Sequence, residues 1–349
     1  MTWALAILAL LGPGADRPVS LVPGCAAGNQ AAYDVVVDPR DADRVFVAED
    51  TVFGPSARGD CLARSDGGLV APPPSFPRRA VPRSLTIDPL DPDRIFAATS
   101  QGLYRSVDGG RSWEFVFAPP ALLGEAPVCC LAFAAGQPSV GYASGDGAVY
   151  KTINSGNKWT IRTNGFPAPP AALPGVSALA IDPGDPDVVY LASVGVYKTI
   201  DGGELWQRSS AGLPGGRVFA VAVDGADSEL LYAGMGSGLY RSVDAAETWQ
   251  PTAFSGRAVL DVRQNPSDLA VWLIGTDAGI FRSGDAGESW ESLESPFSDA
   301  VVYRIAFAPS DSATIYAATS LGVFRTRDSG VHWSLLETAR RVPRQVFRP

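Results

Sequence analysis

Acidic side chains occupy the same place in a short motif that recurs along the chain, and carboxylates are groups that enzymes use as acids, bases and nucleophiles. The first complete copy, LYRSVDGGRSWE at residues 103–114, has the order Ser/Thr-x-Asp-x-Gly-x-x-Trp. The acidic position, or its Asn substitute, falls at Asp66, Asp108, Asn154, Asp201, Asp244, Asp285 and Asp328. The aromatic position falls at Trp113, Trp159, Trp206, Trp249, Trp290 and Trp333. A catalytic carboxylate is not repeated along a chain and replaced by Asn, so we predict a structural role and no catalytic residue in the motif.

The residue types of the motif suit a tight turn between two strands. A short acidic side chain accepts hydrogen bonds from backbone N–H groups just ahead of it. Gly supplies a positive φ at little steric expense, and the Trp buries a large ring at the start of the next strand. Ala246 replaces the Gly in one copy, where we expect a modest strain of ~1 kcal/mol.

The motif marks a long repeat. Its Trp recurs every 41–47 residues, and a copy without Trp, CLARSDGGLVAP, precedes the others. Each unit contains four short runs typical of strands, separated by Gly-, Pro- or Asp-rich turns. Four antiparallel strands in ~45 residues make one propeller blade. The sequence therefore predicts an all-β protein, a single seven-bladed β-propeller of four-stranded antiparallel blades over residues 33–338, with an arm at 16–32 and a basic tail at 339–349.

The first strand of each unit has its own pattern. The seven segments read YDVVVDP, RSLTIDP, CCLAFAA, SALAIDP, FAVAVDG, LDVRQNP and YRIAFAP. Bulky apolar residues at the third and fifth positions alternate with a small residue at the fourth, which suits close packing of neighbouring sheets around an axis. Arg263 and Gln264 break the pattern in the sixth unit.

The motif resembles the Asp-box, or BNR, repeats of bacterial sialidases, sortilin-type receptors, two-propeller xyloglucanases and the photosystem II stability/assembly factor family. The resemblance covers nearly the whole chain. It implies a propeller whose boxes lie on one rim, away from the usual binding face, and it does not by itself choose among these families. Chain length and a single propeller fit the assembly-factor family best.

Glycoside hydrolysis is the enzymatic alternative. Sialidases carry an Arg-Ile-Pro motif, which is absent here, together with an arginine triad and a Tyr–Glu nucleophile pair. Tyr303 beside arginines at the starts of inner strands could form a weak version of that site; these are Arg83, Arg217, Arg257 and Arg304. Xyloglucanases of this class use one Asp from each of two propellers, and Asp34 lies near the first such position. One propeller supplies only half of that acid–base pair, so we predict no catalytic residue and keep a sialidase-like or xyloglucanase-like function as the alternative.

A binding role has better support from the loops opposite the boxes. Pro-stiffened loops carry Phe76, Phe117 and Phe166, and stiff loops lose little entropy when a partner docks. The polar residues expected on the same face are Glu49, Asp50, Arg83, Arg217, Arg257, Asp261, Tyr303 and Arg304. We predict a protein partner, with a glycan as a second possibility. The alternative that these loops fold down and bury themselves over the channel stays open.

Charge and the first residues exclude other classes of partner. A net charge of −9 argues against nucleic acid, because phosphate binding needs a basic surface. The apolar run Trp3 to Leu11 is too short to span a bilayer, and it suits a signal peptide over residues 1–15 although no Lys or Arg precedes it. We therefore expect no transmembrane span and an extracytoplasmic location, with a lipoprotein anchor at Cys25 as a weaker option.

The sequence offers few residues that could bind a metal or a cofactor. One His and no CxxC spacing disfavour zinc, so we expect no cofactor and no metal. The acidic runs DPRDAD, DPLDPD and DPGDPD are more typical of Pro-fixed turns than of calcium loops. Cys25 and Cys61 could form a disulfide in an exported protein, whereas Cys129 and Cys130 are predicted to be inert core thiols.

Overall fold

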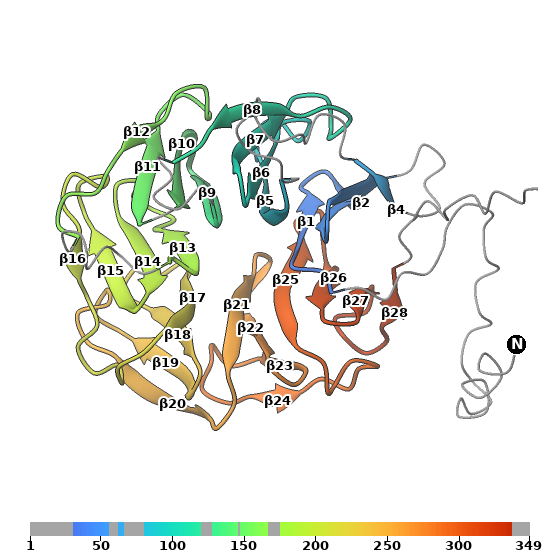
Figure 1. Ribbon diagram of the computed structural model, residues 1–349. Helices are drawn as coiled ribbons and strands as arrows, with labels where there is room; N and C mark the ends of the chain where they lie inside the picture. Colours follow the sequence, from blue (N-terminus) through green and yellow to red (C-terminus); the bar gives the residue numbers. More distant parts are fainter. Residues whose placement is uncertain are drawn as a thin grey trace, which may run out of the picture.

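The structure is a computed structural model that describes residues 31–55, 62–65, 80–119, 128–145, 147–166 and 175–336. These residues form seven four-stranded antiparallel sheets arranged as blades around a central axis (Figure 1). The predicted all-β, seven-bladed propeller is thereby confirmed. The predicted signal peptide, most of the arm and the basic tail lie outside the described residues. Within the described residues, no helix has the length and hydropathy that crossing a membrane requires.

Each blade takes its four strands from one continuous stretch of chain, and the first strand lies innermost (Figure 1). Blade 1 contains β1 (Asp34–Asp38), β2 (Asp41–Ala48), β3 (Val52–Pro55) and β4 (Leu62–Arg64). Blade 2 contains β5 (Pro82–Ile87), β6 (Ile95–Thr99), β7 (Gly102–Ser106) and β8 (Glu114–Phe117). Blade 3 contains β9 (Cys130–Ala134), β10 (Gln137–Gly145), β11 (Ala148–Thr152) and β12 (Thr160–Ile161). Blade 4 contains β13 (Ala178–Ile181), β14 (Val189–Ser193), β15 (Gly195–Thr199) and β16 (Gln207–Arg208).

The remaining three blades complete the ring. Blade 5 contains β17 (Val218–Val223), β18 (Leu231–Met235), β19 (Gly238–Ser242) and β20 (Gln250–Ser255). Blade 6 contains β21 (Val259–Asn265), β22 (Asp268–Thr276), β23 (Ile280–Ser283) and β24 (Glu291–Ser292). Blade 7 contains β25 (Val302–Ala308), β26 (Asp311–Thr319), β27 (Gly322–Thr326) and β28 (Ser334–Leu335). We call the face on which the innermost strands begin the upper face, and the opposite face the lower face.

The hydrophobic core lies between the blades. The second strands are buried along their apolar halves, because a neighbouring blade covers each side of the sheet. Between blades 1 and 2, Phe46 packs with Leu85 and Tyr104 in one cluster. Blade 7 meets blade 1 in the same way, since Val35 shares a cluster with Tyr316. The ring therefore closes by packing whole blades, and the described residues exchange no strand between the first and last sheets.

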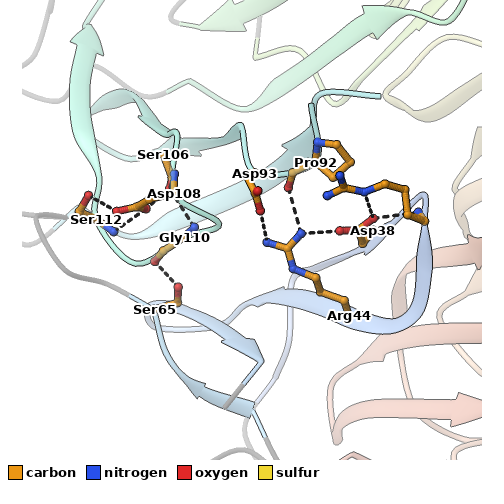
Figure 2. A network of polar contacts seen from close by, with 10 residues as sticks. Asp38, Arg44, Ser65, Pro92, Asp93, Ser106, Asp108, Gly110 and Ser112 are labelled. Atoms are coloured by element: carbon orange, nitrogen blue, oxygen red, sulfur yellow. Dashed lines mark hydrogen bonds and ion pairs between the residues drawn. The ribbon is translucent and has the colours of Figure 1, made fainter. Parts of the chain in front are cut away.

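In blades 2 to 7 the recurring motif forms a hydrogen-bonded turn between the third and fourth strands, which we call the box turn. In blade 1 the copy without Trp falls instead on the fourth strand, β4, and the positions after it, so the prediction of an equivalent box at Asp66 is wrong. In blade 2, Oδ1 of Asp108 accepts bonds from the Ser106 hydroxyl at 2.8 Å and the Ser112 N–H at 2.9 Å. The Ser106 hydroxyl in turn accepts the Gly110 N–H at 2.8 Å (Figure 2). The same three bonds recur in the other five complete copies, including the one with Asn154.

These hydrogen bonds keep the box carboxylates ionised. Burial works against the charge of Asp108, but bonds from Ser112 and Ser106 outweigh it and lower the pKa of Asp108 to about 2. At Asp285, bonds from the side chain and backbone of Ser289 also lower the pKa to about 2. The pKa of Asp328 is lowered for the same reason, chiefly by the backbone N–H of His332. The acceptors of these turns are therefore charged at neutral pH.

Two consecutive residues of each box turn adopt a left-handed backbone. Ala246 has φ of 71°, which confirms the strained conformation expected where Ala replaces Gly. Ala245 before it has φ of 54°, whereas the equivalent residue is Gly109 in blade 2 and Gly202 in blade 4. Blade 5 therefore holds two alanines in a conformation that favours Gly.

Replacement of Asp108 tests the box turn. Asp108→Ala is expected to lower the free energy of unfolding by about 1–2 kcal/mol, because the hydrogen bonds that the carboxylate accepts from Ser106 and Ser112 disappear. Asp108→Asn keeps Oδ1 as an acceptor, as Asn154 does, and should lose less. The folded pKa lies below the unfolded value, so this stabilisation is complete above about pH 4 and is lost as pH falls toward 2. Urea unfolding at pH 7 and pH 3 measures both effects; equal losses for Ala and Asn would contradict the assignment.

Relief of backbone strain gives a gain of stability. Ala245→Gly is expected to raise the free energy of unfolding by about 0.5–1 kcal/mol, because Gly adopts the observed φ without steric strain. Ala253→Gly in β20 of the same blade is the control and should destabilise by a similar amount, since a strand residue gains nothing from Gly. Thermal unfolding of both variants measures the difference, and a loss of stability in both would show that the turn is not strained.

Candidate functional site

A cavity of the described chain runs along the propeller axis. Its volume is about 500 Å³, and the innermost strands of several blades line it. Near the upper face its wall is formed by Asp34, Ser84, Cys130, Ala178 and Arg304. Near the lower face the wall is formed by Pro39, Pro89, Pro266 and Pro309. The cavity is thus polar and partly charged at one end and closed in by prolines at the other.

Bulges at the starts of inner strands decide which side chains surround the upper mouth. In blades 2, 5, 6 and 7 the pairing register skips one residue just before the wall position. We call the residues at this place in the seven blades the rim residues: Tyr33, Arg83, Cys129, Ser177, Phe219, Leu260 and Tyr303. A bulge redirects the side chain that it carries. Tyr33 and Tyr303 lie with ring centroids 5.9 Å apart, and Tyr33 is 47% exposed. The rim therefore presents aromatic, basic and small polar groups to solvent.

A buried ion triad lies just below the rim. The Arg304 guanidinium donates to Oδ1 of Asp34 and to Oδ1 of Asp261, each at 3.2 Å. Both carboxylates are almost fully buried, and one-fifth of the Arg304 side chain is exposed. Oδ2 of Asp34 accepts the backbone N–H of Leu85 in blade 2 at 2.8 Å, and Oδ2 of Asp261 accepts that of Ile305 in blade 7 at 2.8 Å. The triad therefore joins blades 6, 7, 1 and 2 in sequence.

The electrostatics of the triad favour a structural over a chemical role. Burial opposes the charge of Arg304, but Asp34 and Asp261 more than compensate and raise the pKa of its guanidinium. Both oxygens of Asp34 already accept hydrogen bonds, from Val35, Arg304 and Leu85. Both oxygens of Asp261 are likewise engaged, by Arg304, Ile305 and Arg263. Asp261 and Arg304, expected on the binding face, therefore lie beneath it.

The other predicted arginines lie at the upper face. Arg83 is an exposed rim residue. Arg217 is exposed, and its Nε donates to the rim residue Ser177 at 2.8 Å. Arg257 is exposed, and its guanidinium lies 5.8 Å from the ring centre of Phe281. These arginines precede or begin the inner strands of three different blades, as the sequence indicated.

The expected apolar loop residues do not project freely. Phe117 packs against Tyr150 with ring centroids 4.7 Å apart, and Phe166 stacks on Trp206 at 5.4 Å. Both side chains are thus partly buried in the cores of blades 3 and 4, so the alternative in which such loops bury themselves holds for these two. Glu49 is buried and Asp50 is exposed in the turn between β2 and β3. The remaining predicted positions, Asp66, Phe76, Cys25 and Cys61, lie outside the described residues.

Sequence reasoning missed three rim residues. Tyr33, Phe219 and Leu260 stand at the aligned first position of the inner-strand segments, directly before the wall residues. That alignment was visible in the sequence, but the bulges that carry Phe219 and Leu260 were not. The role of Gln264, which breaks the strand pattern, is also explained only by the fold. Its amide N–H reaches the Asp224 carboxylate of blade 5 at 2.6 Å and so ties two blades together.

The acidic turn runs are held by backbone hydrogen bonds. Oδ1 of Asp88 accepts the Leu90 N–H at 2.9 Å, while Oδ2 accepts Arg94 at 3.0 Å. Asp182 accepts the Gly184 N–H at 2.8 Å and the Ser228 hydroxyl at 2.9 Å. Bonds of this kind satisfy each carboxylate inside the turn. Within the described residues, no three Asp, Glu, His or Cys side chains gather as a metal site would need.

Comparison with known proteins places the fold among several classes of propeller. No protein-family model matches the chain. A xyloglucanase of Acetivibrio thermocellus is 31% identical over 130 residues, which are 31% of this chain and only 15% of that enzyme. A solved GH74 xyloglucanase of Xanthomonas campestris superposes with a TM-score of 0.71 at 18% identity, covering 90% of this chain and 55% of that one. YCF48 from Cyanidioschyzon merolae superposes with a TM-score of 0.59 at 17% identity, covering 86% and 96% of the two chains. A structure of YCF48 bound to D1 peptide matches with a TM-score of 0.55.

Removal of the central guanidinium tests the triad. Arg304→Ala leaves two buried carboxylates without their counter-ion, so the free energy of unfolding is expected to fall by about 3–5 kcal/mol. Arg257→Ala is the matched control and should change it by no more than about 0.5 kcal/mol, because that arginine is exposed. Urea unfolding at neutral pH measures both. A loss for Arg304→Ala as small as that of the control would contradict the structural role.

Proposed function

We propose that the chain is a non-catalytic, extracytoplasmic scaffold that binds a protein segment at the upper mouth of its central cavity. One observation carries the proposal: an open cavity of about 500 Å³ lies on the axis, and the two carboxylates at its upper level are held by Arg304 and by backbone N–H groups. Such a cavity offers space and polar contacts to a ligand, yet its acidic groups are already engaged in holding the blades together.

The composition of the rim supports a peptide-like partner. Exposed arginines and partly exposed aromatic rings are the residue types that most often dominate binding energy at protein interfaces. Tyr33 and Tyr303 supply paired rings, and Arg83 adds a fixed positive charge near the axis. Bulged strands carry Arg83 and Tyr303, and side chains held on strands lose less entropy on binding than those on mobile loops. YCF48, which has the same type of fold and is covered over 96% of its length, also has a structure bound to a peptide.

A glycoside hydrolase is the second candidate, because local sequence similarity to xyloglucanases favours it. The similarity includes 38% identity over 96 residues to a xyloglucanase of Paenibacillus sp, which are 9% of that enzyme. Glycoside hydrolysis uses a pair of carboxyl groups about 5–10 Å apart, of which at least one must exchange a proton. Asp34 lines the upper part of the cavity, and its oxygens and those of Asp261 accept hydrogen bonds that join the blades. This engagement supports the scaffold role over hydrolysis by these two carboxylates.

A peptide screen tests the binding role. Immobilised full-length protein is expected to enrich specific sequences from a library of displayed peptides. The double variant Arg83→Ala/Tyr303→Ala should weaken binding of the enriched peptides at least about tenfold, because it removes two interface anchors. Arg111→Ala, an exposed arginine of a box turn on the lower face, is the control and should bind them unchanged. Enrichment of no peptide, or equal loss in the control, would count against the proposal.

A turnover assay separates the two candidates. The purified chain is expected to release no reducing ends from xyloglucan and no free sugar from a sialylated substrate. Turnover that disappears in Tyr303→Phe or Asp34→Asn, while thermal unfolding shows that the variant is folded, would overturn the scaffold proposal in favour of a hydrolase.

A further inference from the structure

The adjacent residues Cys129 and Cys130 form an unusual pair at the cavity mouth. Both are free thiols, and their Sγ atoms lie 3.2 Å apart. Successive side chains of a regular strand point to opposite faces and diverge. Here Cys129 precedes β9, and both residues stand opposite Ser144: the Cys129 N–H donates to the Ser144 carbonyl at 3.0 Å, and Cys130 pairs with Ser144 in the sheet. This local departure from strand alternation brings the two thiols together.

The two thiols also share their surroundings. Sγ of Cys129 lies 3.0 Å and Sγ of Cys130 lies 3.9 Å from the carbonyl oxygen of Val176, so both reach the same acceptor in the segment that leads into blade 4. The Ser144 hydroxyl lies 3.3 Å from Sγ of Cys129. Cys130 lines the central cavity, and Cys129 is partly exposed as a rim residue. The pair can therefore be reached from the mouth while it links blades 3 and 4.

We propose that Cys129 and Cys130 are a redox modification site, a dithiol that closes reversibly to a disulfide between neighbouring residues when it meets a small-molecule disulfide. This inference does not rest on the proposed binding role. It replaces the sequence expectation of two inert core thiols, because inert core thiols would not converge on one carbonyl at an accessible rim.

The reaction balances with a disulfide as the oxidant. The Cys129 thiolate attacks one sulfur of R–S–S–R, which forms a mixed disulfide and releases one thiolate, R–S⁻. The Cys130 thiol then gives up its proton and attacks Sγ of Cys129, which breaks the mixed disulfide and releases the second R–S⁻. Both leaving groups take up the two protons that the protein loses. In sum, two protein thiols and one external disulfide give one protein disulfide and two small thiols.

The surroundings assign the attacking thiol. A hydrogen bond from the Cys130 thiol, together with one from Ser144 and the charge of Arg217, lowers the pKa of Cys129 against the effect of burial. The bond to Cys129 and burial raise the pKa of Cys130. Because the thiolate is the nucleophile in exchange, Cys129 attacks first and Cys130 resolves the intermediate.

The ring formed by neighbouring cysteines should be easy to reduce. Adjacent Cα atoms across a trans peptide lie ~3.8 Å apart, whereas disulfide-linked Cα atoms usually lie ~4.4–6.8 Å apart. The resulting strain raises the reduction potential, which is typical of labile and regulatory rather than structural disulfides. Closure also removes both thiol protons that face Val176, so it alters the contact between blades 3 and 4 at the cavity mouth.

Peptide mapping of the wild-type protein tests the site. The chain is reduced with dithiothreitol, desalted, exposed to oxidised glutathione, alkylated and digested with trypsin. Cleavage places Cys129 and Cys130 together on the peptide Ser112 to Lys151, apart from Cys25 and Cys61. After oxidation, that peptide is expected to be two hydrogen atoms lighter than the dithiol and to carry no alkyl group. If the oxidised protein is first mildly reduced with reduced glutathione, the peptide is expected to carry two alkyl groups. Two alkyl groups after oxidation, or glutathione adducts without ring closure, would overturn the proposal.

Single substitutions test the order of attack. Cys130→Ser is expected to stop at the mixed disulfide, so its peptide should gain one glutathione that persists. Cys129→Ser should react at least tenfold more slowly than Cys130→Ser, because the remaining thiol of Cys130 is buried whereas that of Cys129 is partly exposed. Circular dichroism shows whether each variant is folded, and the wild-type mapping decides the proposal if one is not. Equal rates for the two variants would contradict the assigned roles.

Discussion

The ring depends on one buried cation. Blades 1 and 7 share no strand, so their joint must be held by side chains and by single backbone bonds. Arg304 provides the centre of that joint, because its guanidinium is bonded to Asp34 in blade 1 and Asp261 in blade 6. The Ala32 N–H to Thr319 carbonyl bond at 3.0 Å and the Tyr316 hydroxyl to Ala42 carbonyl bond at 2.9 Å reinforce the same joint farther from the axis. The upper wall of the cavity is therefore formed by the atoms that keep the propeller closed.

The polar groups of the lower face mainly hold the structure together, whereas those of the upper face are candidates for recognition. On the lower face, the box turns and acidic turns bond their carboxylates locally. Ion pairs there also connect neighbouring blades, such as Arg44–Asp93 at 2.7 Å (Figure 2) and Lys151–Asp187 at 2.7 Å. Exposed pairs of this kind contribute little to stability individually. On the upper face, the rim residue differs between most blades, and only blades 1 and 7 share a Tyr at this place. A surface whose side chains vary from blade to blade suits specific binding.

The blades and box turns could be predicted from the sequence because they repeat. The spacing of Trp113 and its equivalents predicted the number of blades. Asn154 indicated that the acidic position of the motif requires a hydrogen-bond acceptor rather than a negative charge. The sequence predicted the site less well, because the site depends on departures from the repeat. The bulges that turn Phe219 and Leu260 upward arise from pairing between strands, which no local pattern encodes. The burial of Phe117 and the pairing of Arg304 likewise depend on contacts between blades that are far apart in sequence.

We propose that the upper rim recognises a partner while the lower face supports the ring. Hydrogen–deuterium exchange of the full chain, measured with and without a peptide selected by the protein, tests this division most directly. The account predicts slower exchange in the segments that begin the inner strands, around Arg83, Phe219, Leu260 and Tyr303, and unchanged exchange in the box turns. Slower exchange confined to the box turns, with the rim unaffected, would contradict it.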